Sequence, residues 1–217
     1  MSAVQATAAA ATAFLPSLSA PRTRARAWLF GEMLAGAVVG LIAAFVLSVD
    51  AVELAARPDA TLTCDVNAVL SCGTVARAWQ ASVFGFPNAF LGLVAEPVVI
   101  TVALAGLAGV TFPRWFMTAA QTIYLLGFLF AYWLFWESLT RIGALCPWCL
   151  TVTVSTTLVF ASMLHWNILQ ENLYWPPRLQ AHALTVVRSG AFAILVLAWL
   201  VALATVVVLK YGSALVA

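Results

Sequence analysis

The chain has 217 residues, of which 64% are hydrophobic and only 8% are charged. A soluble domain carries about 25% charged residues, so this composition excludes a water-soluble globular protein and predicts helices that face lipid. The net charge is only +2, and no basic cluster follows three arginines near the start, so we expect no nucleic-acid binding.

The N-terminal segment, residues 1–25, is rich in alanine, serine and threonine, and its first 21 residues carry no charge. A secretory signal places its positive charges before its apolar core. Here Arg22, Arg24 and Arg26 follow the alanine-rich run. We therefore expect residues 1–25 to form a flexible cytoplasmic tail and not a cleaved signal.

Five stretches are long and apolar enough to cross a bilayer, which takes about 20 residues of helix. They cover approximately residues 28–49, 88–110, 115–137, 146–166 and 187–209. The sequence therefore predicts an all-α membrane protein with five transmembrane helices.

The loop charges predict the orientation of these helices. With the N-terminus in the cytoplasm, the inner segments hold six arginines, and the outer segments hold three arginines and Lys210. Positive residues favour the cytoplasmic side, so residues 50–87 and 138–146 are expected on the extracytoplasmic side of the cell membrane. Disulfides persist on that side and are rare in the cytosol.

All four cysteines lie in or next to these two outer segments. Cys146 and Cys149 flank Pro147 and Trp148 at the start of the fourth predicted helix. Proline favours the first helical position, which makes Cys146 the N-cap and gives the sulfurs free N–H groups that stabilise a thiolate. A disulfide across two residues closes almost no loop. We therefore interpret this pair as redox-active, with a structural disulfide or half of a metal site as the alternatives.

The other pair, Cys64 and Cys72, is separated by seven residues in the polar outer segment. This spacing permits a disulfide across a short turn. Val75, Trp79 and Val83 then follow a helical period, which predicts a short helix on the membrane surface that caps the bundle. The alternative is a stapled loop without chemistry. We expect no metal, because the cysteine spacing does not match that of zinc sites.

Two polar residues stand at the second predicted span. Asn88 opens it and either donates a hydrogen bond to a quinone carbonyl or acts as a helix N-cap. Glu96 lies about two turns further in, and an intramembrane carboxylate is a candidate functional residue. It is either a proton acceptor for quinone reduction or a protonated packing residue beside Pro97.

Three motifs in order give the chain a resemblance to the bacterial branch of the vitamin K epoxide reductase family. They are Cys64-Asp-Val with Ser71-Cys72, then Phe-Gly-Phe-Pro-Asn88, then Cys146-Pro-Trp-Cys149 at the start of a helix. The likeness covers roughly residues 28–166. It implies a four-helix transmembrane bundle that encloses a quinone, menaquinone or ubiquinone, beneath an extracytoplasmic half-helix cap.

The resemblance also implies roles for the site residues. Cys149 would face the quinone, with Cys146 as its exchange partner. Cys72 would bridge to Cys146 during transfer, and Cys64 would be attacked by an outside thiol protein. Asn88 matches a residue that looks like a hydrogen-bond donor to the quinone.

On this basis we assign residues 26–170 to a four-helix redox domain, and residues 171–217 to a cytoplasmic loop and fifth transmembrane helix. We expect a membrane thiol oxidase that passes electrons from a separate DsbA-like, thioredoxin-fold partner through both cysteine pairs to a quinone. The alternatives are a quinone-epoxide reductase that uses the same cysteines and a non-enzymatic membrane protein with structural disulfides.

Overall fold

The computed structural model of the chain describes the backbone of residues 20–216 and the side chains of residues 24–212. Residues 1–19, most of the expected tail, lie outside the described residues. The expected flexible tail extended to residue 25. Helix α2 (Ala20–Ala56) already begins at Ala20, so residues 20–25 are helical.

Five helices are long and apolar enough to cross a membrane. They are α2, α4 (Ala89–Leu107), α5 (Arg114–Glu137), α6 (Pro147–Leu169) and α8 (Ala191–Val216). Within the described residues there is no strand, so the all-α prediction is confirmed. The fifth predicted span began too early, because Val187 belongs to a separate short helix, α7 (Pro177–Arg188).

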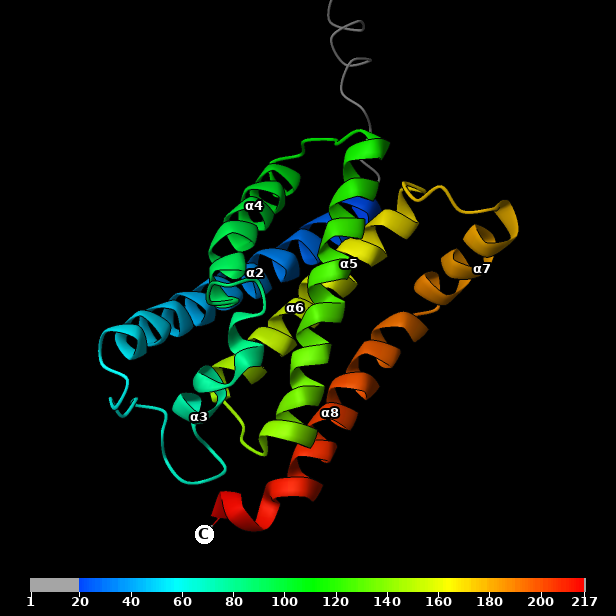
Figure 1. Cartoon of the computed structure of the whole chain (residues 1–217). Coiled ribbons are helices and arrows are strands. Elements are labelled where there is room, and N and C mark those ends of the chain that lie inside the picture. The colour runs from blue at the N-terminus through cyan, green and yellow to red at the C-terminus, as the bar shows by residue number, and fades with distance from the viewer. Residues whose placement is uncertain (1–19, 217) are drawn as a thin grey trace, which may run out of the picture.

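Helices α2, α4, α5 and α6 form a bundle, in which α2 packs against α4 and α6 and α5 packs against α6. Figure 1 shows α2 beginning at the upper end of the molecule and α8 ending at the lower end. Small residues allow close helix contact at the upper end. The ring of Phe30 lies directly over Gly106 on α4, where a Cβ would come within 2.4 Å of it.

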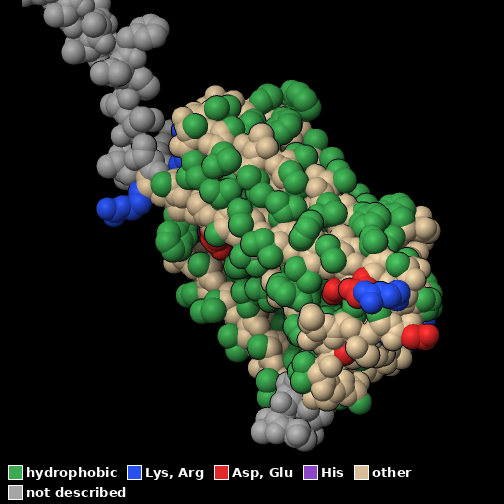
Figure 2. Space-filling view, turned by 90° about the vertical axis from the view of Figure 1, so that its left-hand side faces the viewer, with side chains coloured by type: hydrophobic (Ala, Val, Ile, Leu, Met, Phe, Trp, Pro, Cys, Tyr) green, Lys and Arg blue, Asp and Glu red, His purple; other side chains and the backbone are tan. Residues whose placement is uncertain are grey.

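The outer surface of the helices is largely hydrophobic, as Figure 2 shows for one flank. Large exposed side chains of this kind include Val94, Ile123, Leu126, Ile194 and Leu209. The most apolar stretch of α8 buries none of its residues inside the protein. Such a surface is suited to lipid and fits a multi-pass membrane protein.

The predicted surface helix is two short helices in the structure. They are α3 (Cys72–Arg77) and the 3₁₀ helix η1 (Trp79–Ser82). Ser71 caps α3 by accepting a hydrogen bond from the Thr74 N–H, and the extended backbone of Ala78 ends the helix after six residues. The prediction of one continuous helix was wrong because apolar spacing does not report this break.

Candidate active site

The four cysteines lie in the loop after α2, at the start of α3 and at the start of α6. Figure 1 shows α3 at the lower left of the bundle, beside the beginning of α6. Cys64 and Cys72 form a disulfide with a Cα–Cα distance of 5.6 Å, while Cys146 and Cys149 are free thiols. The Cys146 sulfur lies 3.2 Å from the Cys72 sulfur. A free thiol in contact with a disulfide sulfur is the arrangement that thiol–disulfide exchange requires.

A short backbone ladder holds these two sulfurs together. Leu70 and Leu145 form an isolated parallel bridge. The Leu145 N–H donates to the Val69 carbonyl at 2.7 Å, and the Ser71 N–H donates to the Leu145 carbonyl at 3.0 Å. Cys72 and Cys146 lie directly after the paired segments, so the register of this bridge brings them together.

Asp65 organises the loop that carries the disulfide. Its carboxylate accepts hydrogen bonds from the Leu62 N–H at 2.9 Å, the Ser71 hydroxyl at 2.8 Å and the Gly73 N–H at 2.8 Å. Desolvation raises the pKa of Asp65, but the hydrogen bonds and the charge of Arg77 outweigh it and hold this pKa below its usual value. The loop is therefore held by its polar groups as well as by its disulfide.

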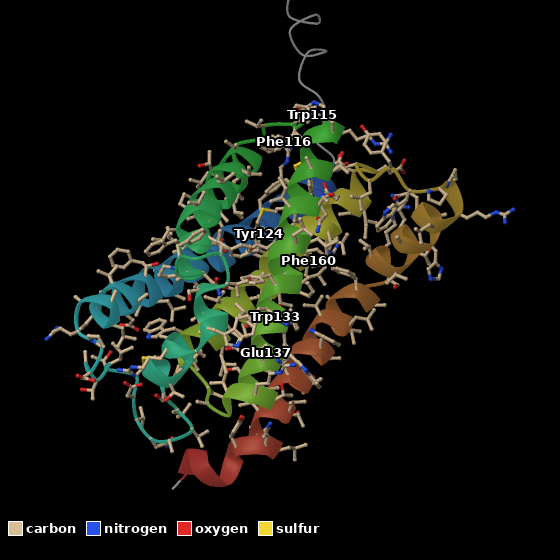
Figure 3. All side chains as sticks on the ribbon, viewed as in Figure 1. Trp115, Phe116, Tyr124, Trp133, Glu137 and Phe160 are labelled. Carbon is tan, nitrogen blue, oxygen red and sulfur yellow. A yellow bond between two sulfur atoms is a disulfide. The ribbon has the colours of Figure 1, made fainter. Side chains whose placement is uncertain are left out.

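Helices α3 and η1, which together we call the cap, are held to the loop after α2 by Arg77 and to helix α5 by Gln80. The Arg77 guanidinium donates to the carbonyls of Pro58 at 2.9 Å and Ala60 at 2.8 Å. The side-chain amide of Gln80 donates to the Glu137 carboxylate at 2.9 Å, and both residues are buried. Figure 3 shows Glu137 at the end of α5 that lies beside the cap.

Cys146 is the N-cap of α6, as the sequence predicted. Its sulfur accepts a hydrogen bond from the Cys149 N–H at 3.4 Å, with Pro147 in the first turn. A hydrogen bond from the Cys149 thiol lowers the pKa of Cys146 most, and the Cys149 and Trp148 N–H groups lower it further. Desolvation and the charge of Asp50 oppose this shift. The net effect favours a Cys146 thiolate, the reactive form of a cysteine.

Asp50 is a site residue that the sequence analysis did not identify. It lies near the end of α2, only 8% exposed, with a carboxylate oxygen 3.9 Å from the Cys64 sulfur. Cys64 follows Asp50 by fourteen positions along the chain. The sequence carries no signal for this contact, because it depends on how the loop folds back over α2.

Asn88 stands at the N-cap position of α4, but its side chain makes no capping hydrogen bond. Its amide donates instead to the Gln80 carbonyl at 2.6 Å and accepts from the Val83 N–H at 3.2 Å. Asn88 is therefore the N-cap residue by position, but its side chain ties the cap to the start of α4 and does not bond to the first helical N–H groups. Its contact with a quinone stays a prediction.

Glu96 is buried inside the bundle. One carboxylate oxygen accepts a hydrogen bond from the Tyr124 hydroxyl at 3.2 Å, and the other has no hydrogen-bond partner among the described residues. Gly40 of α2 makes room for this group, because a Cβ there would lie 3.1 Å from both Glu96 and the Ser155 hydroxyl. A buried polar atom without a partner fits a site that receives a polar ligand.

A groove of about 430 Å³ runs between α2 and α6 on the flank of the bundle. Its lining includes Glu32, Gly36, Leu150 and Ser155, but no cysteine.

An all-helical membrane bundle that holds a disulfide against a Cys-x-x-Cys thiol has the architecture of a membrane thiol–disulfide oxidoreductase. The family model that matches this chain is that of the vitamin K epoxide reductase family, over residues 32–164. This range is more than half of the chain, and the protein belongs to that family. No curated protein matches the chain. Family membership implies an oxidoreductase linked to a quinone.

Proposed function

We propose that this protein is a membrane thiol oxidase that takes electrons from a reduced thioredoxin-fold, DsbA-like partner and delivers them to a quinone. The loop pair Cys64–Cys72 would receive the electrons, and the pair Cys146–Cys149 would pass them on. The observation that carries this proposal is the 3.2 Å contact between the sulfurs of Cys146 and Cys72. That contact joins the two pairs into one relay.

The relay has four exchange steps, each of which moves a disulfide by thiolate attack. A partner thiol attacks Cys64 and releases Cys72, and the partner's second thiol then displaces Cys64, which leaves the partner oxidised and the loop pair reduced. The Cys72 thiolate then attacks Cys146 of an oxidised Cys146–Cys149 pair, and Cys149 leaves as a thiolate. Finally Cys64 attacks Cys72, which re-forms the loop disulfide and releases Cys146. The arrangement of an intact loop disulfide beside two free thiols corresponds to the end of this sequence.

The quinone, menaquinone or ubiquinone, would accept the two electrons and two protons that Cys146 and Cys149 give up. The residues present fit such a group, because Glu96 offers a buried oxygen without a partner beside the Tyr124 hydroxyl. Asn88 and Tyr124 are the amide and hydroxyl side chains that we expect to orient its carbonyls. Cys149, which is partly buried in the first turn of α6, is the proposed electron donor.

The partner would approach the cysteine end of the bundle, which we propose to be extracytoplasmic. The positive-inside bias of the loops supports that orientation. Cys64 itself is 9% exposed, but Val66 nearby is 70% exposed. Val66 is therefore an exposed side chain that a docking partner would meet beside Cys64.

The test is quinol formation by the purified protein in lipid nanodiscs, with a reduced DsbA-type protein and either ubiquinone-1 or a menaquinone analogue. We expect turnover with the natural chain and none with Cys149→Ser, which keeps the size of the side chain but removes the electron donor. Absence of turnover with every quinone and partner tried would contradict the proposal. Reduction of a quinone epoxide without quinone turnover would support the alternative activity.

A further inference from the structure

We propose that Asp50 is the proton acceptor for Cys64 in the step that re-forms the loop disulfide. This inference rests on the proposed relay and adds a residue to it. The carboxylate of Asp50, the Cys64 sulfur and the Cys72 sulfur all lie within 4.8 Å of one another. A base at this place is useful because a neutral thiol is a poor nucleophile, and the thiolate is the attacking species.

The surroundings of Asp50 leave its carboxylate available. The ion pairs among the described residues occupy Glu53 and Glu137, not Asp50. Among the described residues, the polar atom that the Asp50 carboxylate contacts is the Cys64 sulfur, at 3.9 Å. While Cys64 is in the disulfide, its sulfur carries no proton and cannot donate a hydrogen bond to Asp50. Reduction of the loop gives Cys64 a thiol proton, and the buried Asp50 carboxylate is then its acceptor.

The step balances in atoms and charge. The Cys64 thiol gives its proton to the Asp50 carboxylate and attacks Cys72 in the Cys72–Cys146 mixed disulfide. The Cys64–Cys72 bond forms, the Cys72–Cys146 bond breaks, and Cys146 leaves with the electron pair as a thiolate. One negative charge disappears at Asp50 while one appears at Cys146, so the buried site keeps the same net charge.

The charges around Asp50 favour this exchange. The charges of Glu53 on α2 and Asp65 in the loop act on Asp50, and the charge of Asp50 acts in turn on the thiols of Cys146 and Cys149 at the start of α6. The negative charge of Asp50 raises the pKa of Cys146. Protonation of Asp50 removes that opposition when Cys146 becomes a thiolate. The helix N-terminus, which donates the Cys149 N–H to Cys146, then stabilises the leaving group.

The experiment follows the internal transfer alone. The chain with an oxidised Cys146–Cys149 pair is mixed with dithiothreitol or with the reduced partner, without quinone, and acid-quenched samples are analysed by mass spectrometry. In Asp50→Asn we expect the Cys72–Cys146 mixed disulfide to accumulate and its resolution at pH 7 to slow by about 10²-fold, the typical contribution of a general base. The rate in the variant should rise with pH towards the ordinary thiol pKa of about 8.5. Asp59→Asn, which changes an exposed acid in the loop after α2, should behave as the natural chain.

Several outcomes would overturn the inference. One is resolution in Asp50→Asn at the natural rate and with the natural pH profile. A second is Asp50→Glu, which keeps a carboxylate, behaving no better than Asp50→Asn. If Asp50→Asn does not fold, the natural chain still decides: a resolution rate that falls tenfold per pH unit below about 8.5 indicates an unassisted thiol. In the dithiothreitol reaction neither the thioredoxin-fold partner nor a quinone is present. The result therefore does not depend on whether the proposed partner and the proposed quinone are correct.

Discussion

Both ends of the bundle contain buried side chains, but different kinds of contact hold the two ends together. At the cysteine end, individual directional contacts set the geometry, such as the bridge between Leu70 and Leu145 and the Gln80–Glu137 hydrogen bond. At the opposite end, Phe30 packs against Trp166 with ring centroids 5.0 Å apart, within a core of buried apolar side chains. Apolar packing stabilises the bundle through close van der Waals contact between its helices. Directional contacts position the sulfurs, so stability and chemistry should respond to different substitutions.

The largest effect is expected for Cys146→Ser at the cysteine end. The serine cannot exchange disulfides, so quinol formation should fall by at least about 10³-fold. Its thermal unfolding should stay close to that of the natural chain, because Cys146 is a free thiol and Ser is of similar size. A substantial residual rate would show that electrons bypass Cys146.

Phe30→Ala at the opposite end should have the reverse pattern. Phe30 is 1% exposed and fills the space over Gly106, and truncation of a buried phenylalanine costs about 3–5 kcal/mol. Unfolding in detergent or denaturant should shift strongly, while the folded fraction should form the Cys72–Cys146 contact at the natural rate. Loss of exchange in folded Phe30→Ala would break the distinction between the two ends.

Leu145→Pro attacks the backbone bridge without changing a sulfur. The proline removes the N–H that donates to Val69 at 2.7 Å. A misplacement of about 1 Å between reacting groups can cost about 10²-fold in rate, and we expect a loss of that order in transfer from Cys72 to Cys146. Leu145→Ala, which keeps the N–H, is the matched control. Equal rates in both variants would show that the bridge does not position the sulfurs.

Gln80→Ala should loosen the cap. It removes the donor to the buried Glu137 carboxylate, and an unsatisfied buried group of this kind costs about 1–3 kcal/mol. More frequent opening of the cap should raise the alkylation rate of Cys149 by about tenfold, a factor that corresponds to 1.4 kcal/mol. Gln121→Ala, a buried glutamine outside the cap, should leave that rate unchanged. If Cys149 in Gln80→Ala were alkylated at the rate of the natural chain, Gln80 would not hold the cap closed.

The smallest effect is expected from titration of Asp65. Its folded pKa lies below the ordinary value of 3.8, so its stabilising contribution is present above that value and is lost as the pH falls through the lower folded pKa. Pepsin cleavage within the loop should therefore increase only in strongly acidic solution. Asp65→Asn should lack this pH dependence. A rise in cleavage of the natural chain already near pH 6 would contradict the assignment of this transition to Asp65.

Much of this molecule could be predicted from the sequence, because apolar length determines membrane spans and cysteine spacing indicates redox chemistry. The N-cap role of Cys146 followed from Pro147 at the first helical position. The break at Ala78 did not, since apolar spacing continues across it. Asp50 was missed because its contact with Cys64 depends on the fold of the loop. Glu96 was identified as a candidate, but its Tyr124 partner comes from another helix.

The most direct measurement asks whether Cys72 and Cys146 bond to each other in the membrane. A chain with Cys64→Ser and Cys149→Ser retains only these two cysteines, and mild oxidation in nanodiscs followed by mass spectrometry measures their disulfide. We predict rapid and nearly complete formation, and much slower formation of a Cys72–Cys149 bond in the matched chain with Cys64→Ser and Cys146→Ser. Absence of the Cys72–Cys146 disulfide in the folded protein would contradict the relay.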